Sequence, residues 1–114
     1  MNDCIFCKIA EKKLPAKIVY EDNDAIAFDD INPQAPIHVL VIPKKHFSTL
    51  LDFSESDSPL LGRLVTVCRK IAEDRGIAHR GFRISTSCNP EGGQVVFHLH
   101  FHLLGGRQMH GQLG

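Results

Sequence analysis

The chain has 114 residues, the length of one typical domain, and its 43% hydrophobic and 23% charged content excludes a disordered protein. Thirteen basic residues balance thirteen acidic ones, so no net field favours nucleic acid or a membrane surface as a partner. The longest apolar run, residues 39–42, is far shorter than the roughly 20 residues of a membrane helix. The first residues lack a secretory pattern, and we expect a cytoplasmic protein with reduced cysteines.

The first half of the chain predicts a short helix followed by strands. Residues 4–10 suit one or two helical turns. Two β-prone runs, 18–21 and 25–28, are separated by three turn-forming residues, Asp22-Asn23-Asp24, and so predict a hairpin. After a proline-containing loop, the apolar residues 38–42 predict a strand that stops at a proline.

The second half predicts one long helix and two more strands. Between residues 60 and 75, apolar side chains recur at the i, i+4, i+7, i+8, i+11 spacing of an amphipathic helix. Ser58-Pro59 suits its start and Gly76 its end. Strands are expected at 81–87 and 95–104, and hairpin spacing favours antiparallel pairing. The prediction is one α+β domain, residues 1–114, with an antiparallel sheet of about five strands, one main helix and a short N-terminal helix.

Histidines alternate with apolar residues between positions 97 and 103. If this segment is a strand, His98, His100 and His102 share one face, with neighbouring Cα atoms about 6.5–7 Å apart. Such a face can bind a transition metal, or one histidine can be a nucleophile assisted by its neighbours. The alternative without chemistry is a solvated face. Just before the strand, Gly92-Gly93 forms a turn whose N–H groups could approach an anion.

Cys4 and Cys7 have the spacing with which one turn of chain presents two thiolates to a zinc ion. Two more ligands are needed, and the sequence has no second pair of this spacing. A redox pair is the rival interpretation, but no βαβ pattern surrounds the cysteines. From the residues alone, a zinc site and a pair of reduced thiols both remain open.

The segment 98–104 resembles the His-φ-His-φ-His-φ-φ signature of the histidine triad superfamily, where φ is an apolar residue. Similarity extends over nearly the whole chain, through residues 5–9, 15–18, 28–36, 40–46 and 92–94. The segment 104–110 resembles the histidine triad nucleotide-binding (Hint) branch in particular. The resemblance implies the fold of that superfamily and a homodimer.

The resemblance also implies an activity. Hint proteins bind purine nucleoside monophosphates such as AMP or GMP and hydrolyse purine nucleoside 5′-phosphoramidates or related mixed anhydrides. By this resemblance His100 attacks the phosphorus and becomes nucleotidylated, His102 contacts phosphate oxygens, and His38 orients the nucleophile or relays protons. The alternatives are a dinucleoside polyphosphate hydrolase or nucleotidyl transferase of the same superfamily, and a nucleotide-binding regulatory module with vestigial activity.

A nucleotide pocket follows from the same resemblance. Asp30 is expected to accept hydrogen bonds from the ribose, and Gly93 to contact the phosphate through its backbone. Ser87 stands where Hint proteins commonly have Asn, and Val95, which cannot form side-chain hydrogen bonds, where they have Ser. For the apolar members, plain core packing is the alternative. The predicted nucleotide-binding residues are Phe6, Ile9, Phe28, Asp30, Ile31, Leu40, Ser87, Gly93, Gln94, Val95, His100 and His102.

Some bacterial histidine triad proteins share the cysteine pair. The resemblance implies that zinc, held by Cys4 and Cys7, is completed by His46 and His98. This division leaves His98 to structure and His100 to catalysis.

Overall fold

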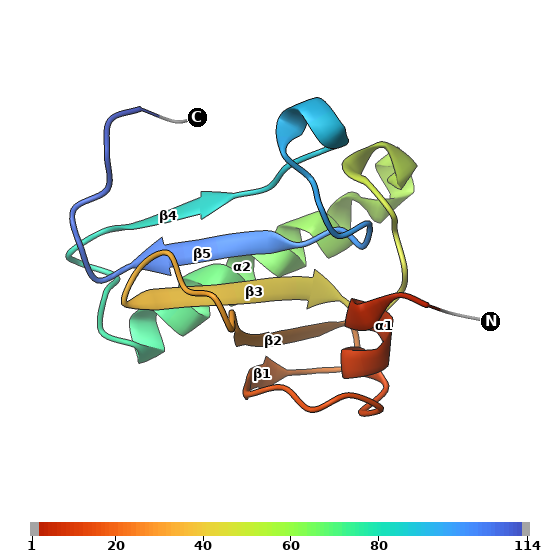
Figure 1. The fold of residues 1–114 in the computed structure, drawn as a ribbon, viewed down its shortest axis with the longest axis horizontal. Helices are drawn as coiled ribbons and strands as arrows, with labels where there is room; N and C mark the ends of the chain where they lie inside the picture. The colour runs from red at the N-terminus through yellow and green to blue at the C-terminus, as the bar shows by residue number, and fades with distance from the viewer. Residues whose placement is uncertain (1–2, 113–114) are drawn as a thin grey trace.

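The computed structural model describes residues 3–112 as one antiparallel sheet with a long helix across one face (Figure 1). The strand order is β1-β2-β3-β5-β4, and every neighbouring pair is antiparallel. This confirms the predicted α+β class and the five-stranded sheet. The helices are α1 (Ile5–Ala10) and α2 (Ser58–Asp74), and the strands are β1 (Ile18–Glu21), β2 (Ala25–Asp29), β3 (Ile37–Pro43), β4 (Phe82–Ser85) and β5 (Phe101–Gly105). Three 3₁₀ turns lie at Leu50–Asp52, Glu55–Asp57 and Pro90–Gly92.

Helix α2 forms the main core with one face of the sheet. Its buried residues include Leu64, Val67 and Ile71, as the apolar spacing predicts, and they pack with strand residues such as Val39 and Leu103. Cys68 is a fully buried core residue, and burial raises the pKa of its thiol to about 12. None of the helices within residues 3–112 is long and apolar enough to cross a membrane.

A second, smaller core lies on the opposite face of the sheet, where α1 packs. Successive side chains of a strand point to opposite faces, so β2 sends Ala25 and Ala27 toward α2 but Ile26 and Phe28 toward α1. Apolar side chains of α1 and β3 complete this second core: Phe6, Ile9, Leu40 and Ile42. Because both faces are covered, β2 is apolar almost throughout instead of alternating.

The strand expected at 95–104 is half as long as predicted. Pairing with β3 begins only at Phe101, opposite Val41, near the end of β3. The preceding residues are irregular, and the Leu99 N–H donates to the Phe47 carbonyl beyond the end of β3. Phe97 is therefore 42% exposed instead of belonging to the apolar face. The strand expected at 81–87 is likewise shorter, because its pairing with β5 covers only Phe82–Ser85.

Candidate active site and metal centre

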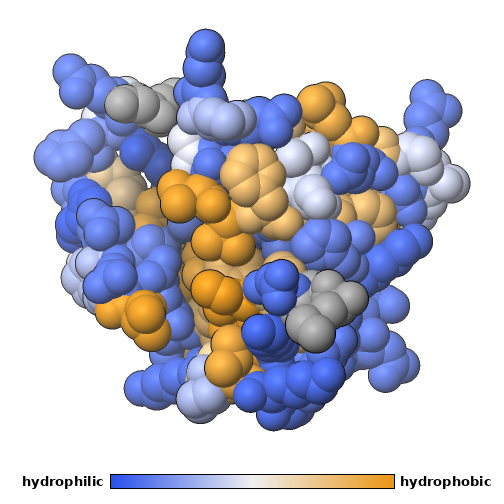
Figure 2. All heavy atoms as spheres, turned by 45° about the vertical axis from the view of Figure 1, so that its right-hand side comes forward, coloured by the Kyte–Doolittle hydropathy of each residue, from blue (hydrophilic) through white to orange (hydrophobic). Residues whose placement is uncertain are grey.

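A cleft of about 510 Å³ opens on the face of the sheet that carries α1. Ile31 and Val95 line it and are 93% and 85% exposed. Apolar side chains form a band across this side of the molecule in Figure 2. Most of the residues predicted to bind a nucleotide line this cleft: Phe6, Ile9, Phe28, Asp30, Ile31, Leu40, Gly93, Val95, His100 and His102. A cavity with apolar walls and imidazoles among its lining suits a ligand with a flat apolar part and a charged part.

Two predicted residues lie outside the cleft lining. Gln94 is buried, and its side chain accepts from the Asn89 N–H and donates to the carbonyls of Ser48 and Val96. These bonds give Gln94 a structural part, because they fix the loop that carries Gly93 and Val95. Ser87 is half-buried, and its hydroxyl lies beside Gly93.

Sequence reasoning also missed part of the cleft wall: Ile5, Leu14, Pro15, Ala16, Asp29 and Val96 line it too. Residues 14–16 follow α1 in a segment without regular structure, so no periodic pattern marks them. Their apolar character within an otherwise polar linker was the available signal.

The three histidines of the triad lie on the face that carries α1, as the alternation predicts, but they enter two different sites. His98 is fully buried and lies among the cysteines, whereas His100 and His102 line the cleft. The intervening Leu99, Phe101 and Leu103 all pack in the main core with α2, so the predicted alternation holds from His98 to Leu103. Of the predicted apolar face, only Phe97 departs, because it is 42% exposed.

Hydrogen bonding gives His100 a defined tautomer. Its Nδ1 lies 2.8 Å from the carbonyl oxygen of His98, which can only accept, so Nδ1 carries the proton. The neutral ring then has its lone pair on Nε2. The ring of Phe6 meets that of His100 edge to face at 5.2 Å between centroids and limits its rotation. The cleft wall thus contains an oriented imidazole with a free lone pair.

A relay of hydrogen bonds defines the tautomers of His38 and His102 as well. The backbone N–H of Gln34 donates to Nδ1 of His38 at 3.0 Å, so a neutral His38 has its proton on Nε2. The Nε2–H of His38 donates to Nδ1 of His102 at 2.9 Å. His102 therefore carries its own proton on Nε2. This N–H is a hydrogen-bond donor on a side chain that lines the cleft.

Both rings of this relay are held in the neutral form. Burial lowers the pKa of His38, although the carboxylate of Asp30 opposes the shift. Burial, and after it the neighbouring His100 and His38, lower the pKa of His102 to about 4. The assigned tautomers hold at neutral pH for this reason.

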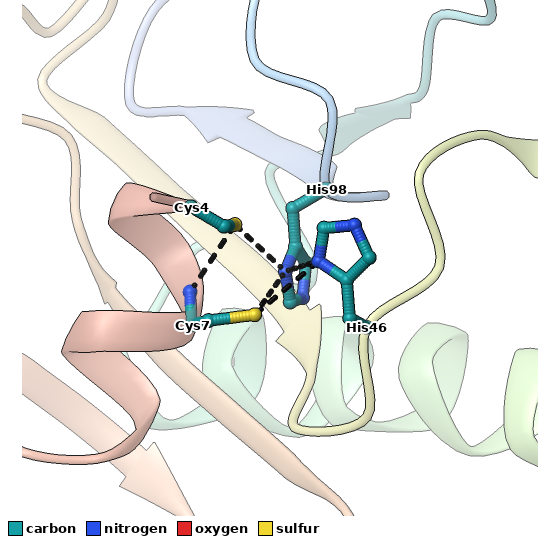
Figure 3. A group of neighbouring side chains, drawn as sticks. All are labelled: Cys4, Cys7, His46 and His98. Carbon is teal, nitrogen blue, oxygen red and sulfur yellow. Dashed lines mark hydrogen bonds between the residues drawn. The ribbon is translucent and has the colours of Figure 1, made fainter. Parts of the chain in front are cut away.

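Cys4, Cys7, His46 and His98 point toward one another between α1, the loop after β3 and the segment before β5 (Figure 3). Cys4 Sγ is 3.3 Å from Nδ1 of His98, and Cys7 Sγ is 3.2 Å from Nδ1 of His46. The two Nδ1 atoms are 3.2 Å apart. A tetrahedral zinc ion with ordinary bond lengths has ligand atoms about 3.3–3.6 Å apart for these donors.

The second nitrogens of these histidines also fit a metal centre. Nε2 of His98 donates to the Pro43 carbonyl at 2.8 Å, which leaves the Nδ1 lone pair directed at the cysteines. Nε2 of His46 lies 3.0 Å from the Ser48 hydroxyl. Burial lowers the pKa of His98 to about 4, so the ring is in the neutral form that binds metals.

A second group, Asp30, His38 and His102, also has its potential ligand atoms within 4.8 Å of one another. Here the hydrogen bonds oppose a metal. The Gln34 N–H occupies Nδ1 of His38, so Nε2 carries a proton and has no lone pair for an ion. The two groups are chemically distinct. The group with the two cysteines directs lone pairs at a common point, whereas the group with Asp30 is a proton-donating relay.

A five-stranded antiparallel sheet with three alternating histidines at the start of β5, two of which line a cleft, defines a histidine triad protein. Residues 3–113 match the family described as "Scavenger mRNA decapping enzyme C-term binding". Together with the similarities below, this match shows that the chain belongs to the histidine triad (HIT) family.

Known relatives are similar over most of their length. The chain is 48% identical to the purine nucleoside phosphoramidase of Escherichia coli K12 over 108 residues, which is 95% of this chain and 91% of that protein. Its structure is similar to that of a HIT family hydrolase from Legionella pneumophila, with a TM-score of 0.96, 47% identity and coverage of 98% of this chain and 100% of that one. A histidine triad protein from Clostridium difficile gives a TM-score of 0.95 at 43% identity, covering 98% and 97%.

Proposed function

We propose that this protein is a hydrolase that cleaves the phosphorus–nitrogen bond of purine nucleoside 5′-phosphoramidates. The observation that carries the proposal is the pairing of two imidazoles on one cleft wall, a lone pair on His100 and an N–H on His102. The name of the Escherichia coli relative supports the substrate class.

The cleft offers a place for each part of the nucleotide. Phe6 and Phe28, whose rings meet edge to face at 5.4 Å, supply apolar walls for the purine together with Ile9 and Leu40. The Asp30 carboxylate is held by the Asn32 N–H at 2.8 Å and accepts from the ribose hydroxyls. Gly93 lies in the left-handed conformation, with φ of 90°, and presents backbone to the phosphate without a side chain.

The reaction then takes two displacements at phosphorus. Nε2 of His100 attacks, the bond from phosphorus to nitrogen breaks, and the leaving nitrogen takes a proton from water and departs as the amine. The Nε2–H of His102 donates to a phosphoryl oxygen. As His100 becomes cationic, its hydrogen bond to the His98 carbonyl strengthens, because charged donors form stronger bonds. Water displaces His100 in the second step, releasing the nucleoside monophosphate and the starting imidazole.

We also propose that a structural zinc ion is held by Cys4, Cys7, His46 and His98. The ion would supply a cross-link between α1, the loop after β3 and the segment before β5. None of its ligands is the proposed nucleophile. The convergence of two Nδ1 atoms and two sulfur atoms supports this assignment, since the lone pair that His98 directs at the group needs a cation or a proton as its partner.

The resemblance to Hint proteins further supports a homodimer, and α2 and its neighbourhood carry exposed apolar side chains such as Val65 and Leu51. We place the activity in such a dimer, acting on AMP- or GMP-type substrates.

The test is a rapidly quenched reaction with an adenosine phosphoramidate, followed by intact-mass analysis. We expect one nucleotidyl adduct on the wild-type chain and none on His100→Ala, whose kcat falls about 10⁴-fold or more while AMP binding survives. An adduct on His100→Ala would exclude this nucleophile. AMP binding by calorimetry without turnover or adduct in the wild type would instead identify a nucleotide-binding regulatory module.

A further inference from the structure

Arg107, in the turn that follows β5, is hydrogen-bonded to the loop that contains Gln34. Its Nη2 donates to the Gln34 carbonyl at 3.0 Å and its Nε to the same oxygen at 3.3 Å. Its Nη1 donates to the Gln108 carbonyl at 2.9 Å. Within residues 3–112 no carboxylate pairs with this guanidinium, whereas Arg63 and Arg75 both pair with aspartates. A guanidinium that uses two donors on one carbonyl fixes the position of that group.

Gln34 is also the residue that sets the tautomer of His38. Its N–H donates to Nδ1 of His38, and His38 in turn donates to Nδ1 of His102. The carbonyl and the N–H of Gln34 belong to different peptide groups, so the connection is mechanical: the guanidinium fixes the backbone of Gln34 and thereby the direction of its N–H. Hydrogen bonds on either side of Gln34, joined through its backbone, thus connect the turn after β5 with the cleft.

The backbone next to Arg107 lies close against the same loop. A Cβ built on Gly106 would lie 2.9 Å from Cβ of Pro36, and Gly106 has φ of 90°, a conformation that favours glycine. The turn and the loop therefore lie in close contact, and no room remains at Gly106 for a side chain. Gln34 contributes one more bond, from its side-chain amide to the Asn32 carbonyl at 3.2 Å, which stiffens the loop.

We propose that Arg107 is a positioning residue for the reaction: by fixing Gln34 it keeps His38 in its Nε2–H tautomer and His102 in the donor state that faces the phosphoryl group. The proposal rests on the proposed hydrolase function for its kinetic part. Its structural part, the tautomers of two histidines, holds for the resting protein and needs no substrate. Arg107 itself does not line the cleft.

The test compares Arg107→Met, which keeps the length of the side chain but removes every donor, with Arg107→Lys, which keeps the charge and one donor group. Arg83→Met is the matched control, because Arg83 also donates to a carbonyl of the C-terminal segment, that of His110 at 2.7 Å, and forms no hydrogen bond with the loop of Gln34 within residues 3–112. Each variant is labelled with ¹⁵N-histidine, and the Nδ1 and Nε2 shifts report the tautomers of His38 and His102. Steady-state kinetics with an adenosine phosphoramidate gives kcat and KM.

We expect Arg107→Met to convert His38 from one tautomer to a mixture and to lower kcat about 10-fold with little change in KM, because a small misplacement of a reacting group costs rate. Arg107→Lys should recover part of both effects, and Arg83→Met should match the wild type in both. Wild-type nitrogen shifts in Arg107→Met overturn the proposal, whatever the rate. Should the wild type lack turnover altogether, the hydrolase function fails, and the shifts alone decide the positioning of His38.

Discussion

The carbonyl oxygen of His98 accepts a hydrogen bond from Nδ1 of His100 at 2.8 Å. The imidazole of the same His98 is fully buried among Cys4, Cys7 and His46. One residue thus serves two sites, its side chain in the metal group and its main chain behind the nucleophile. The metal group and the nucleophile are connected through a single backbone segment.

Replacement of both cysteines, Cys4→Ser with Cys7→Ser, should remove zinc and lower the melting temperature. Structural zinc in small peptides contributes about 10–16 kcal/mol of apparent binding free energy, so its loss costs stability. Most of the activity should remain at low temperature. The Pro43 carbonyl still accepts from the His98 ring, and the His98 carbonyl still accepts from the His100 ring. Elemental analysis, a thermal melt and a phosphoramidate assay check the three parts.

Two outcomes would contradict this prediction. Wild-type protein that contains less than about a tenth of an equivalent of metal after expression with added zinc lacks the tetrahedral site. If zinc is present and its removal abolishes turnover in a folded chain, the ion is catalytic, and the parts assigned to His98 and His100 must be exchanged.

The free energy of unfolding should fall between neutral and mildly acidic pH because of the relay histidines. Histidines of the unfolded chain take up protons near pH 6.5, whereas folded His102 does so only near pH 4, and the pKa of folded His38 is lowered as well. The unfolded state therefore binds more protons between these values, which favours unfolding as the pH falls. Urea unfolding at several pH values above 5.5 measures the slope. A His38→Asn, His102→Asn double variant is the control, and an equal slope in both proteins would refute the assignment.

Gly105→Ala should destabilise the fold by about 1–3 kcal/mol, the usual cost of overpacking a core. A Cβ at this position would collide with Cδ1 of the buried Ile77. Ile77→Val removes that atom. The double variant should therefore be destabilised by less than the sum of the two single changes. Gly62→Ala is the comparison: nothing lies within 4 Å of its Cβ position in α2, and the change should stabilise the chain by up to about 1 kcal/mol. Additive effects of the Gly105 and Ile77 changes would disprove the contact.

Light scattering should give twice the 12.7 kDa mass of one chain at micromolar concentration. Stable homodimers bury about 1,600 Å² or more in total, and we expect the interface to cover Val65, an exposed apolar residue of α2. Val65→Glu should then shift the mass toward that of one chain. A wild-type mass of 12.7 kDa under the same conditions removes the dimer from the proposal.

Periodicity was sufficient to predict α2 and most of the sheet, because burial on one face leaves a repeating pattern that needs only local sequence. It failed between residues 95 and 100, where the alternating pattern continues but no strand pairing forms, because the pairing with β3 begins only at Phe101. The assignment of His98 to the metal group and of His100 to the cleft depends on contacts with residues distant in sequence and has no local signal. The contact of Arg107 with Gln34 joins residues 73 positions apart, and only the folded chain brings them together.

Two backbone groups act on different histidines with opposite results. The N–H of Gln34 occupies Nδ1 of His38 and keeps that ring from binding a metal. The carbonyl of Pro43 accepts from Nε2 of His98 and leaves Nδ1 of that ring ready to bind one. Neither group is a side chain, so no point substitution at Gln34 removes the first, apart from proline, and none at position 43 removes the second. The assignment of His38 to proton transfer and of His98 to metal binding is therefore insensitive to most substitutions at those two positions. It would change only if the loops that carry them changed shape.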